Sequence, residues 1–265
     1  MLTQIVKMIA DSRCGHAIPS AAAFSRDAIK WCFQAVGVTR GPIIISVENE
    51  QDMSLEEAAE LTKKFAAMFP QVPAGLSLEH CEDFKTAMRA VLAGYTNIVM
   101  PVFCGKEALQ AAGHLCRTAG ARLEAEVTLE DECLRTADSL RGMVSELSVD
   151  GVFIRDARPA DADGVWEVAL ARKLWGLYAE TGILIGIRGE IFSDRECLKL
   201  AARTGLSRVT FSDSLGAAGI QAAHALVLQP EKDRRGLPKL QASVCEGFTK
   251  ELSACMQTLN AHNRF

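Results

Sequence analysis

The sequence predicts a parallel (β/α)8 barrel, the TIM-barrel fold, with a helix added at each end. Short apolar runs of strand length alternate eight times with amphipathic segments of helical length. The chain has 265 residues, 49% of them hydrophobic, which suffices for one large core and is close to the size of about 250 residues typical of such barrels. The alternative, an open doubly wound sheet, usually has fewer units. We therefore expect a single TIM-barrel domain over residues 1–265.

The repeating units can be placed one after another along the chain. The expected strands are residues 17–19, 43–47, 76–78, 97–100, 121–127, 151–154, 183–187 and 208–212. The expected helices begin after Ser25, cover residues 55–69, 83–93, 106–118, 129–145 and 164–180, run from Ser193 to 202, and cover 214–228. Ser25, Ser54 and Ser193 are the predicted N-caps, because a serine hydroxyl can accept a hydrogen bond from a free N–H group of the first helical turn.

Both ends of the chain are expected to add helices. At the N-terminus, Thr3 can cap a short helix that closes the bottom of the barrel. Residues 230–265 are predicted to form a C-terminal helical extension that follows the charged run 231–235. Its apolar residues recur every three or four positions, at Leu240, Val244, Phe248, Leu252, Cys255 and Leu259. This stripe either packs on the outer helices of the barrel or joins a second subunit, so a homo-oligomer through the C-terminal helix is one of two alternatives.

Composition excludes several classes of partner. The net charge is -4 with both signs mixed, which argues against a nucleic-acid partner, since that would need a basic face. No apolar run reaches the roughly 18 residues of a membrane span. Nine cysteines without a Cys-x-x-Cys pair or a signal-like N-terminus indicate a reducing compartment and no structural zinc cluster. We expect a cytoplasmic protein that binds neither nucleic acid nor membrane.

The stretch most suggestive of chemistry follows the third expected strand. The apolar run 76–78 ends on Glu79 and His80, just before a helix that begins near Asp83. In TIM barrels, residues at the C-terminal ends of strands line the active-site mouth, so an acid next to a histidine is a candidate for proton transfer or metal binding. The structural alternative is a helix start with a favourable acid and a surface histidine.

This stretch and several others resemble the class II, zinc-dependent fructose-bisphosphate and tagatose-bisphosphate aldolases. The family motif Leu-Asp-His-Gly appears here as Leu78-Glu79-His80-Cys81. Further matches in the same order, within residues 11–228, are Ala17-Ile18-Pro19, Pro42-Ile43-Ile44-Ile45, Ala90-Val91-Leu92-Ala93-Gly94-Tyr95 and Leu123-Glu124-Ala125-Glu126. The resemblance implies a TIM-barrel lyase of carbohydrate metabolism, in which Glu79 takes the place of the catalytic aspartate and His80 that of a zinc ligand.

The resemblance also shows where the chain departs from that family. Family members hold zinc with three histidines, after the third, sixth and seventh strands. Here the last two positions read Arg155-Asp156-Ala157-Arg158 and Gly186-Ile187-Arg188-Gly189-Glu190. The resemblance therefore implies a divergent member that lacks two of the three zinc histidines, and we expect no cofactor. The alternative is a divalent metal, such as zinc, in an oxygen-rich site made by His80 with Glu124 and Glu126.

Anion binding is the chemistry expected in place of the metal. Arg155, Arg158 and Arg188 carry guanidinium groups, which bind phosphate or carboxylate in a bidentate manner. Gly189, Ser212 and Ser214 lie between the seventh and eighth strand-to-helix loops, where barrels bind phosphate at a helix N-terminus. We expect a small anionic metabolite, such as a sugar phosphate. Surface salt bridges and plain helix capping are the alternatives.

Three functions remain open from the sequence. The first is an aldolase-like barrel without standard zinc chemistry, which binds or acts on a phosphorylated or acidic sugar or keto compound. The second is an active aldolase whose site is rebuilt around Glu79 and His80. The third is a structural or regulatory subunit without catalysis. Polar groups that converge at the barrel mouth would favour the first two over the third.

Overall fold

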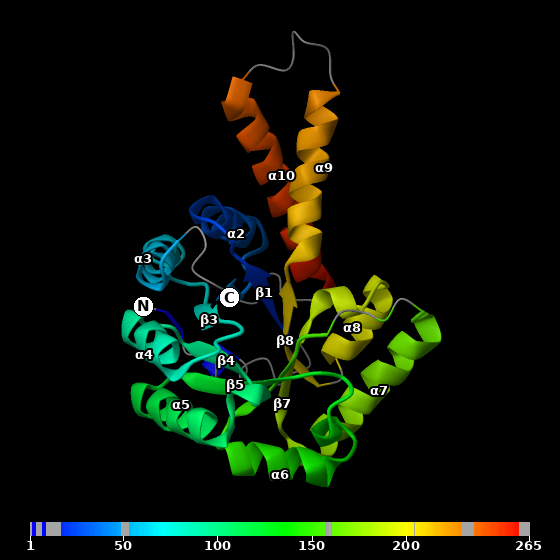
Figure 1. Ribbon diagram of the computed structural model, residues 1–265. Helices are drawn as coiled ribbons and strands as arrows, with labels where there is room; N and C mark the ends of the chain where they lie inside the picture. Colours follow the sequence, from blue (N-terminus) through cyan, green and yellow to red (C-terminus); the bar gives the residue numbers. More distant parts are fainter. Residues whose placement is uncertain are drawn as a thin grey trace.

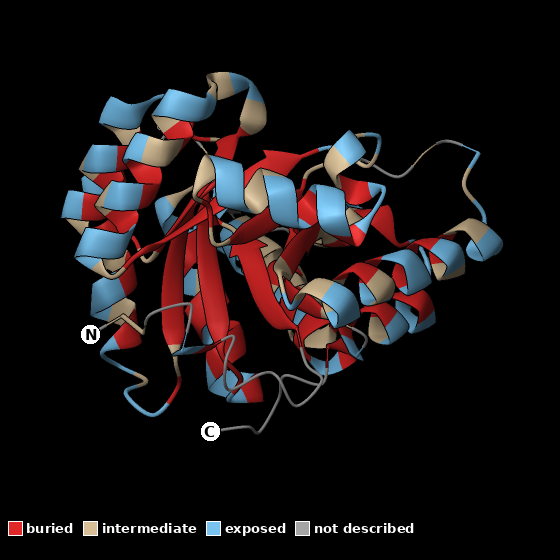
Figure 2. Ribbon diagram, turned by 90° about the horizontal axis from the view of Figure 1, so that it is seen from below, coloured by how far each residue is buried: buried red, intermediate tan, exposed pale blue. Residues whose placement is uncertain are grey.

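The computed structural model describes residues 2–3, 7–8, 17–48, 53–156, 159, 161–203, 205–228 and 236–259. In this part of the chain, eight parallel strands follow one another around a closed barrel, and β1 pairs with β8 to close it. Helices surround the strands, which are buried along their length (Figures 1 and 2). The predicted (β/α)8 fold is confirmed. The single domain over 1–265 stays a prediction.

The strands are β1 Ile18–Ala22, β2 Ile43–Val47, β3 Ala74–Leu78, β4 Asn97–Pro101, β5 Arg122–Val127, β6 Gly151–Ile154, β7 Leu184–Arg188 and β8 Leu206–Phe211. The helices are α2 Arg26–Thr39, α3 Leu55–Ala66, α4 Phe84–Ala93, α5 Lys106–Ala119, α6 Ala137–Leu147, α7 Gly164–Thr181, α8 Arg195–Arg203, α9 Asp213–Val227 and α10 Gly236–Thr258. Short 3-10 turns lie at η1 Val102–Cys104, η2 Glu132–Leu134 and η3 Gly189–Ile191.

Two of the three predicted serine caps are confirmed. Ser25 Oγ accepts from Ala28 N at 3.2 Å, and Ser54 Oγ accepts from Glu57 N at 3.1 Å. Ser193 does not cap its helix: its hydroxyl donates to Glu167 Oε1 at 2.6 Å, and α8 begins two residues later. A carboxylate buried on the neighbouring helix is the stronger acceptor, so it takes the serine hydroxyl as well as its N–H.

Helix α6 begins eight residues later than predicted. The expected helix covered 129–145, whereas the observed one is Ala137–Leu147. Thr136 is its N-cap and accepts from Ser139 N at 3.1 Å, and the residues before it form the separate turn η2. A threonine at a helix start satisfies an otherwise free N–H, which fixes the boundary there. Smaller differences occur at α3, which ends at Ala66, and at β1, which continues to Ala22.

Along β1 and β2, the inner face changes from apolar to polar. Near the N-terminal ends of the strands, Met8, Ile18 and Ile44 form an apolar cluster. Two residues further along β1 and β2, on the same face, Ser20 and Ser46 share a hydrogen bond of 2.5 Å. Lys7 and Met8 are helical, but the rest of the predicted N-terminal helix lies outside the described residues.

The last two helices, α9 and α10, form a hairpin that projects from the barrel (Figure 1). The last four of the six residues of the predicted stripe are buried in the same chain: Phe248, Leu252, Cys255 and Leu259. Phe248 contacts Trp31 of α2 and Phe24, with ring centroids 5.5 Å and 6.3 Å apart. This part of the stripe therefore packs on the barrel's own elements. None of the described helices combines the length and the apolarity that crossing a membrane requires.

Candidate functional site

Glu79 follows β3 directly, and its side chain points into the barrel. It is 3% exposed. Its Oε1 atom accepts from Ser46 Oγ at 2.6 Å, from Arg208 Nη1 at 2.8 Å and from Thr210 Oγ1 at 3.0 Å. These partners come from β2 and β8, so the Glu79 contacts cross the barrel interior. The candidate catalytic carboxylate is thus hydrogen-bonded to three side chains of the barrel interior.

Arg208 is the centre of this interior cluster, and the sequence analysis did not single it out. Its side chain is fully buried. Nε donates to Glu124 Oε2 at 2.9 Å, while Nη1 donates to Glu79. The guanidinium carbon lies 4.3 Å from the centre of the Phe153 ring, which adds a cation–π contact. Asn97 Nδ2 also donates to Glu124 Oε2, at 3.2 Å. One guanidinium therefore holds two buried carboxylates.

The electrostatics of the interior cluster keep Glu79 ionised. Burial by itself would raise the pKa of the Glu79 carboxyl, but the Arg208 guanidinium and the hydrogen bond from Ser46 outweigh it, and the pKa lies below its ordinary value. Burial would likewise lower the pKa of Arg208, but Glu124 and Glu79 hold it above its ordinary value. The three bonds all fall on Oε1, and an ionised carboxylate has no proton to donate to a substrate.

His80 lies at the rim, between two carboxylates. Its Nδ1 is 2.8 Å from Glu126 Oε1 and its Nε2 is 3.1 Å from Glu82 Oε1. The backbone of His80 has φ of 55°, in the left-handed region that non-glycine residues rarely adopt. The ring also contacts Phe103 edge to face, with centroids 6.1 Å apart. Both ring nitrogens are thus already at hydrogen-bonding distance from acceptors.

A zinc ion held by three histidines does not fit these residues. Metal-bound histidines usually give one ring nitrogen to the metal and the other to a carboxylate, and His80 has a carboxylate at each. Among the described residues, no group of three His, Cys, Asp or Glu side chains is arranged to hold a metal ion. Arg155 follows β6 and Arg188 is the last residue of β7, and both carry the same sign of charge as a metal ion.

The two arginines meet at the mouth of the barrel on a residue that the sequence analysis missed, Glu48. Arg155 Nη2 bonds Glu48 Oε1, and Arg188 Nη2 donates to Glu48 Oε2 at 3.2 Å. Arg155 Nη1 also donates to Glu126 Oε2, at 3.4 Å. A continuous chain of contacts therefore links His80, Glu126, Arg155, Glu48 and Arg188. Arg158, the third predicted arginine, lies outside the described residues.

The residues predicted to bind phosphate lie around the start of α9, where a carboxylate of the chain accepts from the N–H groups. Glu190 Oε1 accepts from Ser212 N at 2.6 Å and from Asp213 N at 3.0 Å. Ser214 Oγ is buried and has no hydrogen-bond partner. Gly189 and Ser214 border a cavity of about 160 Å³ beside Glu190. Gly189, Ser212 and Ser214 are thus brought together, and the Glu190 carboxylate lies where the phosphate was expected.

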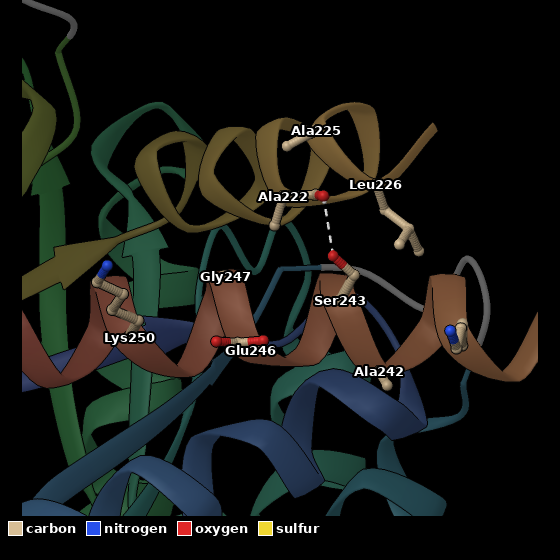
Figure 3. A pocket seen from close by; sticks show the side chains of 9 residues that line it. Ala222, Ala225, Leu226, Ala242, Ser243, Glu246, Gly247 and Lys250 are labelled. Atoms are coloured by element: carbon tan, nitrogen blue, oxygen red, sulfur yellow. Dashed lines mark hydrogen bonds between the residues drawn. The ribbon is translucent and has the colours of Figure 1, made fainter. Parts of the chain in front are cut away.

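Two further hollows lie apart from these groups. One of about 490 Å³ is lined by Leu129, Asp156 and Trp166, among others, after β5 and β6. Burial raises the pKa of Asp156, and Asp131 and Glu130 add to the effect, against the hydrogen bond that Asp156 accepts from Leu129 N. The other, of about 460 Å³, lies between α9 and α10, where Ser243 Oγ donates to Ala222 O at 2.8 Å (Figure 3).

A signal for the missed residues does exist in the sequence. Charged or polar residues recur at every second position within the apolar runs that form strands, as in Arg122, Glu124 and Glu126 of β5 and Arg208 and Thr210 of β8. Alternate strand residues share a face, so this period of two marks a polar inner face. A second signal is a repeated Ser-x-Glu pattern, which places Glu48 directly after β2 and Glu79 directly after β3.

Comparison with known proteins places the fold. No protein-family model matches the chain, and no curated protein sequence matches it significantly. Solved structures do match: the YdjI aldolase from Escherichia coli K12 has a TM-score of 0.83 and 14% identity, over 100% of this chain and 99% of that chain. The fructose-bisphosphate aldolase (Fba) from Campylobacter jejuni has a TM-score of 0.79 and 14% identity, over 98% and 95% of the two chains.

A third solved structure has the same likeness. A putative fructose-1,6-bisphosphate aldolase from Coccidioides immitis has a TM-score of 0.72 and 14% identity, over 98% of this chain and 97% of that chain. The three matches cover nearly the whole of each chain, so the likeness includes the barrel and the elements around it. This chain therefore has the TIM-barrel fold of these aldolases.

Proposed function

We propose that this barrel binds a small anionic metabolite, a phosphorylated or acidic sugar or keto compound, through Arg155 and Arg188 at its mouth. In this proposal it is a divergent relative of the class II aldolases that works without their three-histidine zinc chemistry. The observation that carries the proposal is the convergence of two guanidinium groups, from the ends of β6 and β7, on the single carboxylate of Glu48.

The Glu48 carboxylate occupies the place between Arg155 and Arg188 that we propose for the anionic group of the ligand. A carboxylate between two guanidinium groups has the charge and geometry of the ligand anions that arginine binds. The Glu48 side chain is 38% exposed, and those of Arg155 and Arg188 are 30% and 19% exposed, so solvent reaches all three. An ion pair at this depth contributes only about 0–1 kcal/mol, and an external anion can replace it at small cost.

The interior cluster of Glu79, Glu124 and Arg208 supports the proposal that this barrel works without the zinc chemistry of the class II aldolases. Aldol chemistry on this fold would need a carboxyl group that exchanges protons with a substrate, and Glu79 is bonded to Arg208, Ser46 and Thr210 instead. A metal held at the ends of β6 and β7 would lie near Arg155 and Arg188 and would be repelled by both. The cytoplasmic location expected from the cysteines agrees with a metabolite ligand and belongs to the same proposal.

Ligand-dependent stability tests the proposal. The probes are inorganic phosphate, a sugar monophosphate, a keto acid and, as the uncharged reference, a neutral sugar. A ligand at 100 times its Kd adds about 2.7 kcal/mol to the free energy of unfolding, or roughly 5 °C in Tm for a chain of this size. We expect at least one anion to give such a shift with the wild type, and the neutral sugar to give none.

Arginine variants show where the anion binds. The Arg155→Ala, Arg188→Ala double variant should lose the shift and bind the same anion at least tenfold more weakly. The matched control is Arg26→Ala, Arg89→Ala, which removes two arginines from exposed ion pairs with Glu57 and Glu56. It should keep the wild-type shift. Equal shifts in both double variants would show that the mouth arginines do not bind the ligand.

A further inference from the structure

The start of α9 is the position where a TIM barrel offers free N–H groups to a phosphate, and here an internal carboxylate occupies it. Glu190 follows β7 and reaches across to the helix that follows β8. Its Oε1 accepts from two consecutive N–H groups, those of Ser212 and Asp213. A phosphate oxygen bound at a helix start would use the same donors. Glu190 therefore competes with an external anion for them.

The start of the preceding helix is filled in the same way. Glu167, from α7, is fully buried and accepts from Ser193 N at 3.0 Å and from Asp194 N at 3.3 Å at the start of α8. The two helix starts that follow β7 and β8 thus each hold a glutamate from another element. In both cases the negative charge also lies where the helix dipole favours it.

The Glu190 position differs from the Glu167 position because a cavity lies beside the Glu190 carboxylate. Glu190 Oε2 and Ser214 Oγ are buried oxygen atoms without a hydrogen-bond partner. Both residues border the cavity of about 160 Å³, which Arg195 also lines. Arg195 is itself paired with Glu251, which lines the same cavity, at 2.8 Å. The start of α9 therefore keeps space for a small anion beside the carboxylate that now accepts from its N–H groups.

We infer that Glu190 is a built-in occupant of the second anion position of this barrel, and that the ligand at the mouth carries one anionic group rather than two. The second half of the inference rests on the proposed function, because it takes Arg155 and Arg188 as the first anion position. A bisphosphate would have to displace Glu190 as well as Glu48. A monophosphate or a carboxylate needs to displace Glu48 alone.

Titration calorimetry with inorganic phosphate tests the inference on the full chain. The wild type should bind one phosphate. Glu190→Ala should bind two, because the N–H groups of Ser212 and Asp213 become free and the cavity enlarges. Glu190→Ser, whose side chain is too short to reach those groups, should do the same and serves as the second variant if the alanine variant folds poorly. Glu190→Gln should bind one, since its amide oxygen can still accept from both N–H groups.

Combination with the mouth variant separates the two proposals. Glu190→Ala in the Arg155→Ala, Arg188→Ala background should bind one phosphate, at least tenfold more tightly than that background alone. If this triple variant binds one phosphate while the wild type binds none, Glu190 is confirmed as the occupant of the second position. The mouth site of the proposed function is then wrong. A wild type that binds two phosphates, or alanine and serine variants that fold and gain none, would overturn the inference about Glu190.

Discussion

Two ion-pair clusters lie in this barrel, one in its interior and one at its mouth, and they are built from the same two kinds of side chain in inverse arrangements. In the interior one guanidinium holds two carboxylates, whereas at the mouth one carboxylate holds two guanidinium groups. The interior side chains are 0%, 5% and 0% exposed for Arg208, Glu79 and Glu124. The mouth side chains are 30%, 38% and 19% exposed for Arg155, Glu48 and Arg188.

The difference in burial decides what each cluster can do. Breaking a buried pair leaves an uncompensated charge in a medium of low polarity and costs about 3–5 kcal/mol. Breaking a partly exposed pair costs about 0–1 kcal/mol, because water replaces the lost partner. The burial of the interior cluster is that of a structural support, and the exchange of Glu48 for a ligand that we propose belongs to the mouth cluster. The variants below test this contrast, from the largest expected effect to the smallest.

Arg208→Met should produce the largest loss of stability. The methionine leaves Glu79 and Glu124 buried without their countercharge, so the free energy of unfolding should fall by about 3–5 kcal/mol in urea denaturation. Changing Glu79 and Glu124 to Gln in the same chain removes the unpaired charges and should recover part of the loss. If Arg208→Met alone lowers the free energy of unfolding by less than about 1 kcal/mol, the interior pairs are as weak as those at the mouth, and the contrast between the two clusters is wrong.

Glu79→Gln should change how stability depends on pH. The pKa of Glu79 is lower in the folded chain than in the unfolded chain, so its contribution is present above the unfolded value of about 4.3 and is lost as pH falls through the folded value. The variant should lose about 1–3 kcal/mol at pH 7. Unfolding curves from pH 7 to pH 3 should show a smaller decline below about pH 5 than in the wild type. Parallel declines would contradict the lowered pKa.

Glu48→Ala should change stability little and ligand binding substantially. Its removal should alter the free energy of unfolding by less than about 1 kcal/mol, because the pairs at the mouth are partly exposed. Anion affinity should rise, since Arg155 and Arg188 no longer have to release a carboxylate. Glu56→Ala, which removes the partner of Arg89 on the outer surface, is the matched control and should leave affinity unchanged. Weaker anion binding by Glu48→Ala would show that Glu48 helps to form the site.

The fold was predictable because its signal is local. Apolar runs, caps such as Ser25 and Ser54, and the alternation of elements all act within about ten residues. The interior cluster was not predictable in the same way, because Glu79, Glu124 and Arg208 meet only when the barrel closes. Alternation along one strand identifies its inner face but not the partner across the barrel. The same holds for Glu190, whose contact with the start of α9 forms only between the ends of two strands in the folded barrel.

The smallest expected effect is that of His80→Ala on bound zinc, and it tests whether the rim of the barrel retains metal chemistry. Zinc affinity depends on several neutral imidazole or anionic ligands in tetrahedral geometry. His80 supplies one imidazole, whose two nitrogens face Glu126 and Glu82, while Arg155 and Arg188 follow the strands that would supply the other ligands. We expect elemental analysis of chelator-free protein to show no stoichiometric zinc in the wild type or in the variant.

The same pair of proteins tests the alternative of an active aldolase. In a coupled assay of fructose 1,6-bisphosphate cleavage with added zinc, we expect little or no turnover from either protein. An oxygen-rich site of His80 with Glu126 and Glu124 would be weaker than a three-histidine site, and Glu124 is already held by Arg208 in the interior. Stoichiometric zinc with turnover that His80→Ala abolishes would reverse this conclusion. It would show that the rim binds metal despite the arginines, and that catalysis proceeds without a free Glu79.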